Sequence, residues 1–325
     1  MAVLVTCASG FVGRAFVRAL TAAGERVHVL IRDPAKAAWF PDQEVIVGDM
    51  HDPACVARAL CGVEAVVHAP PIVYPDGDPE AALAMHRRAQ VESTRLVLEQ
   101  AVRAGAGNVL FVSSAHVTGR SADRVLCEIA DHGRPDTPYA QAKLEAEELV
   151  CSYADRHALR VVILRPPGIY GPGDKSIITA LRRAAELNLW LPIKGVDARH
   201  SLVYVDNLAR AGAALLRDGA GPHEARVFIV KDPVDYLAGD LYAAVCRALG
   251  KKSKSFWAPL PLVRALGAVG VGLKHVPKLR WLGIFRHLLT PQRYCGHLFQ
   301  ETLPGFSYIG LDEALRASLG SPEAV

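Results

Sequence analysis

A tyrosine and a lysine stand four residues apart in the segment YAQAK, as Tyr139 and Lys143. Residues at this spacing share one face of a helix, and Pro138 suits the first position of that helix. A lysine ammonium beside a phenol favours the phenolate form, which can accept a proton from a substrate. The pair therefore predicts a proton-transfer site in which Tyr139 is the acid/base.

Two serines end an apolar run upstream of this pair, in the segment LFVSSAHVTG, as Ser113 and Ser114. The run predicts a buried strand, and a hydroxyl at its end can hydrogen-bond a substrate oxygen. A lone tyrosine–lysine pair at this spacing more often lies on a solvated helix face. The serine-tipped strand that precedes it makes a catalytic role the better interpretation.

The chain opens with a strand-like run followed by TCASGFVG, residues 6–13. A strand, a glycine turn and a helix in this order aim backbone N–H groups and the positive end of the helix at a pyrophosphate. Gly10 and Gly13 stand where such a turn requires glycine, but Cys7 occupies the first of its special positions. Cysteine is small enough for that position if its φ is negative, so we expect a dinucleotide site with an unusual first residue.

Short apolar runs alternate with helical patterns through the first half of the chain. The runs are VLVT, RVHVLI, EVIV, EAVVH, NVLFVS and LRVVIL. This alternation predicts an α/β fold, a Rossmann-type doubly wound parallel sheet. From Pro166 onward the pattern loosens, with a strand at SLVYV and helices near 207–217 and 238–249. We expect a dinucleotide-binding domain over 1–167 and a smaller substrate-binding lobe over 168–325, interleaved with the first.

These segments together resemble the extended short-chain dehydrogenase/reductase family, of the NAD-dependent epimerase/dehydratase type, over nearly all of residues 2–318. The resemblance rests on TCASGFVG, GDMHD, VVHAP, FVSSAHVTG, YAQAK, LRPPGIYGPGD and RHSLVYVDN. It implies a catalytic triad of Ser114, Tyr139 and Lys143, in which Ser114 holds the reacting oxygen and Lys143 orients the ribose and tunes Tyr139.

The same resemblance implies an NAD(P)(H) site with Gly10 and Gly13 at the pyrophosphate and Asp49 near the adenine. Its residues would be Thr6, Ser9, Gly10, Phe11, Val12, Gly13, Arg32, Asp49, Met50, His68, Ala69, Tyr139, Lys143 and Pro166. Two positions depart from the family pattern: Cys7 replaces a glycine, and Gln90 stands where the family generally has asparagine. Both departures bear on cofactor affinity more than on proton transfer.

The choice between NAD and NADP depends on the end of the second strand, VHVLIRD. A carboxylate there would bind the ribose 2′-hydroxyl of NAD, but the position holds Ile31, followed by Arg32. An arginine can pair with the 2′-phosphate of NADP. The sequence therefore favours NADP(H), although Arg32 also fits an ordinary surface role and Asp33 stands beside it.

Three functions compete for the substrate side. LRPPGIYGPGD and the closing FSYIGLDEALRASL resemble the 3β-hydroxysteroid dehydrogenase branch, which includes enzymes that oxidise 4-carboxysterols with loss of carbon dioxide. LPIKGVDARHSLVYVDN is also similar to nucleotide-sugar 4-epimerases and dehydratases, in which Arg199 would clamp a diphosphate. A cofactor-binding protein without turnover is the third. We favour the sterol or lipid substrate and expect Ser114, His116, Tyr170 and Arg199 to face it.

Positive charge is concentrated in a basic apolar segment, residues 251–300. This segment holds nine Lys and Arg and no Asp or Glu, although the whole chain carries only +4. Prolines and cations interrupt every candidate membrane span, so we expect the segment to lie on an anionic membrane surface rather than to cross it. Packing in the core of the second lobe is the alternative. The sequence shows no nucleic-acid recognition motif.

The remaining features indicate a cytoplasmic protein, peripheral on the membrane if that segment binds lipid. The seven cysteines form no CxxC pair, and no cysteine–histidine spacing fits a metal, so we expect neither disulfides nor a metal site. A strand begins at Ala2 with no signal peptide before it. The resemblance also implies a homodimer that pairs through the helices that include that of Tyr139.

Overall fold

The structure is a computed structural model. It describes residues 1–73, 78–119, 124–127, 133, 135–174, 177–189, 191–194, 198–218, 221, 223–257, 259, 261–262, 265, 269 and 290–320.

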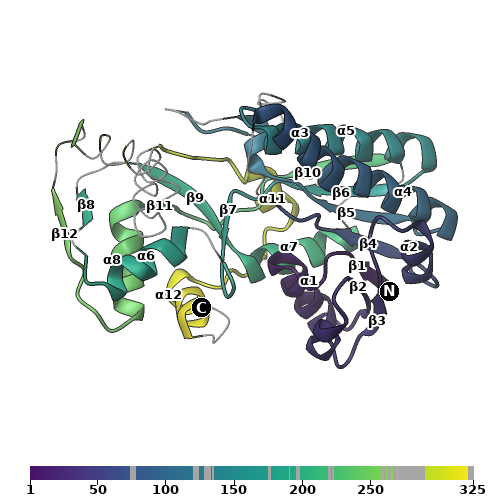
Figure 1. Cartoon of the computed structure of the whole chain (residues 1–325), viewed down its shortest axis with the longest axis horizontal. Coiled ribbons are helices and arrows are strands. Elements are labelled where there is room, and N and C mark those ends of the chain that lie inside the picture. The colour runs from purple at the N-terminus through teal and green to yellow at the C-terminus, as the bar shows by residue number, and fades with distance from the viewer. Residues whose placement is uncertain are drawn as a thin grey trace.

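Within these residues a seven-stranded parallel sheet forms the centre of the larger lobe (Figure 1), in the order β10-β6-β5-β4-β1-β2-β3. The strands are β1 (Ala2–Val5), β2 (Arg26–Ile31), β3 (Glu44–Val47), β4 (Ala65–His68), β5 (Asn108–Val112), β6 (Arg160–Leu164) and β10 (Glu224–Phe228). Strands β1, β4, β5 and β6 are almost wholly buried because helices cover both faces of the sheet. The predicted Rossmann-type fold is confirmed.

Helices pack on both faces of the sheet. On one face α1 (Phe11–Ala22) lies against α7 (Val205–Asp218). The other face carries α2 (Pro53–Ala59), α3 (Pro79–Arg87), α4 (Ser93–Ala104) and α5 (Pro138–His157). The helices that contact the strands bury apolar side chains against them, such as Phe16 of α1 and Val150 of α5.

The smaller lobe contains two short sheets (Figure 1). One has the order β11-β9-β7, built from β7 (Gly168–Tyr170), β9 (Arg199–Tyr204) and β11 (Asp235–Leu237). The other pairs β8 (Leu191–Lys194) with β12 (Ser255–Trp257). In its described part the helices are α6 (Ile177–Glu186), α8 (Ala238–Ala248) and α12 (Leu311–Gly320), whereas α11 (His297–Thr302) lies beside β10, where Arg226 donates to Thr302 Oγ1 (3.3 Å). Because β10 and α7 lie beyond residue 200 yet belong to the larger lobe, the chain passes between the lobes more than once.

A buried carboxylate, Asp232, holds the junction of the two lobes. It accepts hydrogen bonds from the hydroxyls of Tyr170 (2.8 Å) and Tyr236 (3.0 Å), from Asn207 Nδ2 (3.1 Å) and from the Tyr204 backbone N–H (3.2 Å). Burial raises the pKa of Asp232, while these donors act in the opposite direction. The carboxylate thereby fixes β7, β9 and α7 relative to one another.

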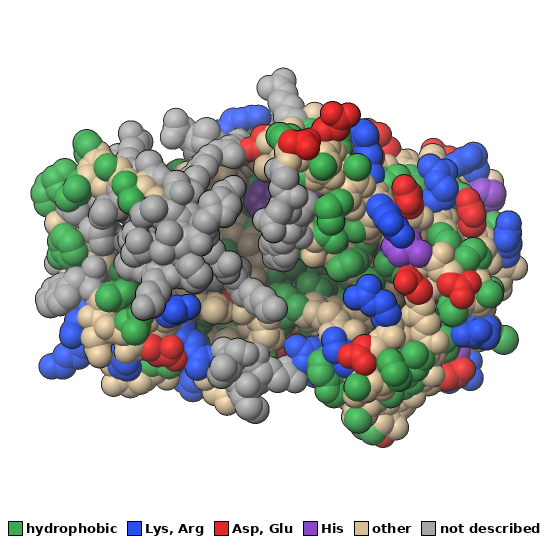
Figure 2. Space-filling view, in the orientation of Figure 1, with side chains coloured by type: hydrophobic (Ala, Val, Ile, Leu, Met, Phe, Trp, Pro, Cys, Tyr) green, Lys and Arg blue, Asp and Glu red, His purple; other side chains and the backbone are tan. Residues whose placement is uncertain are grey.

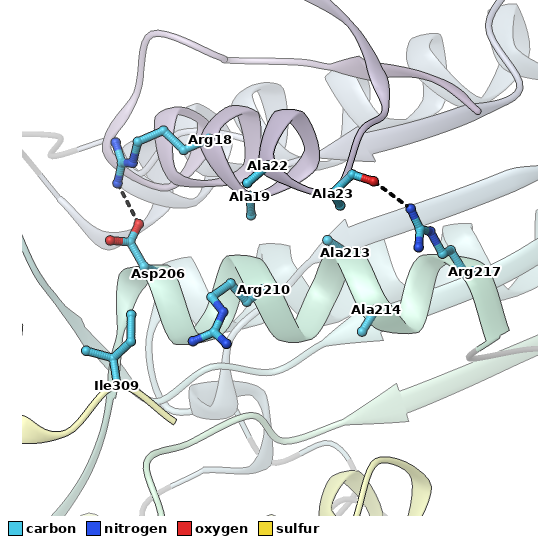
Figure 3. A pocket seen from close by; sticks show the side chains of 10 residues that line it. All are labelled: Arg18, Ala19, Ala22, Ala23, Asp206, Arg210, Ala213, Ala214, Arg217 and Ile309. Atoms are coloured by element: carbon cyan, nitrogen blue, oxygen red, sulfur yellow. Dashed lines mark hydrogen bonds and ion pairs between the residues drawn. The ribbon is translucent and has the colours of Figure 1, made fainter. Parts of the chain in front are cut away.

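Small side chains let α1 and α7 approach closely. A Cβ added to Gly212 would lie 2.5 Å from Phe16 Cε1. Arg18 pairs with Asp206 (2.6 Å), and Arg217 Nη2 donates to the Ala23 carbonyl (3.0 Å). Between these contacts lies a groove of about 490 Å³ whose lining is rich in alanine (Figure 3). Its lining residues are Arg18, Ala19, Ala22, Ala23, Asp206, Arg210, Ala213, Ala214, Arg217 and Ile309. None of the predicted catalytic or cofactor residues lines it.

Candidate active site

The glycine turn joins β1 to α1. Gly10 is the N-cap of α1, and no side chain caps the helix, so the first-turn N–H groups remain available to an anion. The Gly10 N–H donates to the Cys7 carbonyl (2.9 Å), and a Cβ on Gly13 would lie 2.3 Å from that oxygen. Residue 13 therefore needs glycine, residue 10 leaves little room for a side chain because an added Cβ would lie 3.1 Å from the same oxygen, and the uncapped helix end fits a pyrophosphate. Ser9 lies in the same turn, and Phe11 and Val12 are the first residues of α1.

Cys7 corrects one expectation. Its φ is +53°, whereas the sequence argument required a negative value. A non-glycine residue in the left-handed region costs about 1 kcal/mol or more, so this turn carries local strain. Desolvation raises the pKa of the partly exposed thiol to about 11, and its Sγ lies 3.6 Å from Met50 Sδ. The thiol is therefore protonated at neutral pH.

Charged side chains gather at the ends of β2 and β3, beside the turn. Arg32 is exposed directly after β2. The neighbouring Asp33 is the N-cap of a 3₁₀ helix, Pro34–Trp39, and its Oδ1 accepts the Ala35 N–H (3.0 Å). The charges of Arg32 and Asp49 both act on the Cys7 thiol, which places them near the glycine turn.

His68 ends β4 and connects it to β1 and α4. Its Nδ1 lies 2.7 Å from Thr6 Oγ1, and its Nε2 lies 3.1 Å from Thr94 Oγ1. Burial lowers the pKa of His68 to about 3, with a further decrease from the Lys143 charge. The ring is thus neutral at physiological pH. Ala69 follows it, also buried.

Lys143 projects from α5 into the protein and is 2% exposed. Its Nζ donates to the Val112 carbonyl (2.7 Å) at the end of β5 and lies 5.0 Å from the centre of the Phe111 ring. Desolvation lowers the pKa of Lys143 to about 7, while Glu147 opposes this shift. An amine with a pKa near neutrality can exchange its proton during turnover.

Tyr139 lies in the first turn of α5, which starts at Pro138 as predicted. Thr137 caps the helix by accepting the Ala140 N–H (3.1 Å), and this cap fixes where Tyr139 and Lys143 point. The half-buried Tyr139 ring makes an edge contact with His86 of α3, at 5.6 Å between ring centres. His86 was not anticipated. The signal was its position four residues before Gln90, on the same helical stretch.

Ser114 lies two residues after the end of β5 and is the N-cap of a 3₁₀ helix, Ala115–Thr118, that packs against α5. It is 6% exposed, and its Oγ accepts the His116 N–H (3.3 Å) and lies 3.2 Å from His116 Nδ1. The Ala115 N–H donates to the Pro166 carbonyl (2.9 Å), which brings the segment after β6 beside this serine. Among the described residues, the buried Ser113 Oγ has no hydrogen-bond partner.

Gln90 lies in a π-helical turn, Arg88–Glu92, between α3 and α4. Such turns frequently occur at functional sites. The side chain is buried, and its Nε2 donates to the Pro71 carbonyl (2.6 Å). Its Oε1 has no partner in the described part of the chain. A site with unsatisfied buried acceptors is suited to an added donor from water or a ligand.

Two residues predicted to face the substrate differ in their exposure. Tyr170 is completely buried and donates its hydroxyl to Asp232, so it packs the junction of the lobes. Burial raises the pKa of Tyr170 well above its usual value. Arg199 is exposed at the start of β9 in the smaller lobe. Figure 2 shows the surface hollowed between the two lobes.

The basic apolar segment 251–300 is described only in part. Lys251 Nζ donates to the Ala185 and Glu186 carbonyls (3.1 Å each), whereas Trp257 is 67% exposed with Phe256 beside it on β12. Hydrophobic side chains gather over β12 in Figure 2. Arg264, Lys274, Lys278, Arg280, Trp281 and Arg286 lie outside the described residues. No helix of the described ranges is long and apolar enough to cross a membrane.

None of the seven cysteines, all of which lie within the described residues, forms a disulfide. Within the described residues no group of three or more His, Cys, Asp or Glu side chains could hold a metal ion.

The fold and the placement of these residues define a dinucleotide-dependent α/β enzyme. A model of the NAD dependent epimerase/dehydratase family matches residues 3–230, and the chain belongs to this family of extended short-chain dehydrogenases/reductases. It is therefore an NAD(P)-dependent enzyme of this type, as the sequence predicted.

Its relatives include both dehydrogenases and epimerases. The chain is 30% identical over 344 residues to the 2-alkyl-3-oxoalkanoate reductase of Stenotrophomonas maltophilia, with 100% of each chain covered. It is 27% identical over 275 residues to the 3β-hydroxysteroid dehydrogenase/Δ5→4-isomerase of Mycobacterium tuberculosis (81% and 73% covered). It is 26% identical over 271 residues to the UDP-glucose 4-epimerase of Vibrio cholerae (82% and 81%).

The fold also matches solved structures. The UDP-glucose 4-epimerase of Thermus thermophilus in complex with NAD superimposes with a TM-score of 0.72 at 20% identity, over 98% of each chain. At that identity the likeness shows the shared fold alone.

Proposed function

We propose that the protein interconverts a secondary alcohol and a ketone on a sterol or similar lipid, with Ser114, Tyr139 and Lys143 as its catalytic residues. The observation that carries the proposal is the buried Lys143 on the same helix face as Tyr139, bonded to the end of the strand that Ser114 follows. When bound, the nicotinamide accepts the carbinol hydride or supplies it.

The side chains handle the oxygen and the proton. In the oxidative direction Tyr139, as phenolate, takes the hydroxyl proton while the carbinol C–H electron pair leaves as hydride, and the ketone results. Ser114 donates a hydrogen bond to the same oxygen. Lys143, whose pKa of about 7 lets it alternate between ammonium and amine, stabilises the phenolate. The uncapped N-terminus of α1 would hold the pyrophosphate.

The substrate class follows from the relatives' chemistry. The 2-alkyl-3-oxoalkanoate reductase and the 3β-hydroxysteroid dehydrogenase are both named for an alcohol or ketone on a lipophilic skeleton. A 4-carboxysterol is one such substrate, and its oxidation product, a β-keto acid, can lose carbon dioxide.

We further propose NADP(H) as the preferred cofactor. The Asp33 carboxylate, which would compete for a ribose hydroxyl, is occupied by the Ala35 N–H. The exposed Arg32 remains at the end of β2, where a 2′-phosphate would lie. Replacement of Arg32 by Ala should then weaken NADP(H) binding and leave NAD(H) binding almost unchanged.

A nucleotide-sugar 4-epimerase is the second candidate. It is favoured by Arg199, a cation exposed at the start of β9, and by the similarity to the UDP-glucose 4-epimerase of Vibrio cholerae. Cytoplasmic location, peripheral attachment through 251–300 and homodimer formation stay predictions.

Purified protein should be incubated with NADP⁺ or NAD⁺ and either a 3β-hydroxysterol or UDP-glucose, with nicotinamide absorbance followed over time. With the sterol we expect net reduction of the nicotinamide cofactor. Its rate should be about 10²-fold or more lower in Tyr139→Phe, the scale of a lost acid/base. Epimerisation of UDP-glucose without net reduction would favour the second candidate.

A further inference from the structure

A histidine two residues beyond the proposed catalytic serine contacts that serine twice. His116 Nδ1 lies 3.2 Å from Ser114 Oγ, and the His116 backbone N–H donates to the same oxygen (3.3 Å). Both contacts follow from the 3₁₀ helix Ala115–Thr118, because Ser114 is its N-cap. Ser114 is buried, whereas His116 is exposed. The proposed function uses Ser114 but gives His116 no part.

The hydrogen-bonding capacity of a serine hydroxyl limits what this arrangement can do. A hydroxyl has one proton and two acceptor lone pairs. The His116 backbone N–H uses one lone pair, so one proton and one lone pair remain. These two are divided between His116 Nδ1 and the substrate oxygen. If Nδ1 carries no proton, it accepts a hydrogen bond from the Ser114 hydroxyl. If Nδ1 carries a proton, it donates to the remaining lone pair of Ser114 Oγ, and the Ser114 hydroxyl can then donate to the substrate.

We propose that His116 is a positioning residue that donates from Nδ1 to Ser114 Oγ and so directs the Ser114 hydroxyl proton toward the substrate oxygen. The proposal rests on the proposed function of Ser114. A hydrogen bond to the reacting oxygen strengthens as negative charge develops on it, so its direction affects the transition state more than substrate binding. Loss of the histidine should therefore lower kcat with little change in KM.

Two variants test whether residue 116 acts as a hydrogen-bond donor or only fills space. His116→Asn keeps an N–H donor close to the place of Nδ1, whereas His116→Leu removes it. We expect His116→Leu to lose about tenfold in kcat and His116→Asn to retain most of the rate, the scale of one oriented hydrogen bond. Cofactor dissociation constants should match the wild type in both. His297→Leu, which removes an exposed histidine of α11, is the matched control and should change nothing.

The coupling to Ser114 is tested by a double-mutant cycle. In a Ser114→Ala background, His116→Leu should cause no further loss. An equal loss in both backgrounds, or a His116→Asn variant as slow as His116→Leu, would overturn the proposal. Tyr139→Phe is measured beside them, since loss of turnover there supports the proposed function whatever the His116 series shows.

A second measurement needs no turnover. Nitrogen-15 NMR of the histidine rings in the full-length protein reports which ring nitrogen carries the proton. We expect His116 to be protonated at Nδ1 in the wild type and to lose that preference in Ser114→Ala. An unprotonated Nδ1 on His116 in the wild type would overturn the proposal. This result does not depend on whether the protein is a dehydrogenase or an epimerase.

Discussion

At the scale of single residues, the site depends on groups that burial has moved from their ordinary ionisation. Lys143 is the clearest case, since its surroundings disfavour the ammonium form and lower its pKa to about 7. His68 is held neutral by the same effect. The candidate site therefore holds one group able to change charge near neutral pH and another that stays uncharged.

The depressed pKa of Lys143 predicts a pH-dependent cofactor affinity. The ammonium favours an anionic dinucleotide, and in the free protein it is present below about pH 7 and lost as the pH rises through that value. Affinity should thus be full below this pH and fall by up to about tenfold per unit above it, because binding then takes up one proton. Isothermal titration calorimetry across this range measures it.

Lys143→Met should bind the cofactor weakly, and its affinity should not change with pH across this range. His68, with a pKa of about 3, and Cys7, with a pKa of about 11, do not titrate in this range. A slope that persists in Lys143→Met would assign the titration to another group.

The left-handed backbone at Cys7 predicts an asymmetric response to substitution. Glycine adopts a φ of +53° without strain but makes the unfolded chain more flexible, so Cys7→Gly should stay within about 1 kcal/mol of wild-type stability. A β-branched side chain is strongly disfavoured there, so Cys7→Val should lose about 2 kcal/mol and bind the cofactor more weakly. Denaturant unfolding and calorimetry check both. Equal stability of the two variants would contradict the backbone assignment.

At the scale of elements, the parts of the fold with a strong local pattern were predictable from the sequence. Strands β2 and β3 match the predicted runs RVHVLI and EVIV residue for residue, and α5 begins at the predicted Pro138. Strand β10 was missed, because EARVF lacks a buried apolar run and pairs with β6 from more than sixty residues away. Such a long-range pairing leaves no local signal.

Within the site, residue types and spacing predicted which strand ends and helix face come together. They did not predict backbone detail. The positive φ of Cys7 depends on how β1 enters α1, and the π-helical turn at Gln90 depends on one extra residue between α3 and α4. Contacts between elements, such as that of His86 with Tyr139, arise only from packing.

The close approach of α1 and α7 predicts the effect of a single methyl group. In Gly212→Ala the new Cβ would lie 2.5 Å from Phe16 Cε1 and 3.0 Å from Leu164 Cδ1, so side chains or the helix must shift. We expect a loss of about 1–3 kcal/mol in unfolding free energy. Gly107→Ala is the control, since nothing lies within 4 Å of its added Cβ, and it should stay near wild type. Comparable losses in both would contradict this account of the α1–α7 contact.

At the scale of the whole molecule, charge and apolar surface are unevenly distributed. The segment 251–300 carries nine cations and no acid, and the exposed Trp257 and Phe256 lie at its start. A lipophilic substrate has to leave a bilayer to reach an enzyme, so a segment of this composition would shorten its path if it bound the membrane.

The concentration of positive charge in residues 251–300 predicts salt-sensitive binding to anionic vesicles. Each cation near such a membrane contributes on the order of 1 kcal/mol, and an exposed tryptophan adds an interfacial anchor. Trp257→Glu should weaken vesicle flotation at low salt, whereas Trp39→Glu, at an exposed tryptophan of the larger lobe, should not. Protein that stays in the soluble fraction at low salt would assign the segment to core packing instead.

Net hydride transfer to a lipid ketone is the central claim, and isotopic labelling tests it most directly. The protein is supplied with a 3-oxosteroid and reduced nicotinamide cofactor deuterated at the transferable position, and the product is analysed by mass spectrometry. We predict one deuterium on the carbinol carbon of the steroid alcohol for each cofactor oxidised, formed about 10²-fold or more slowly by Tyr139→Phe. An unlabelled steroid, together with epimerisation of UDP-glucose that consumes no cofactor, would contradict the account.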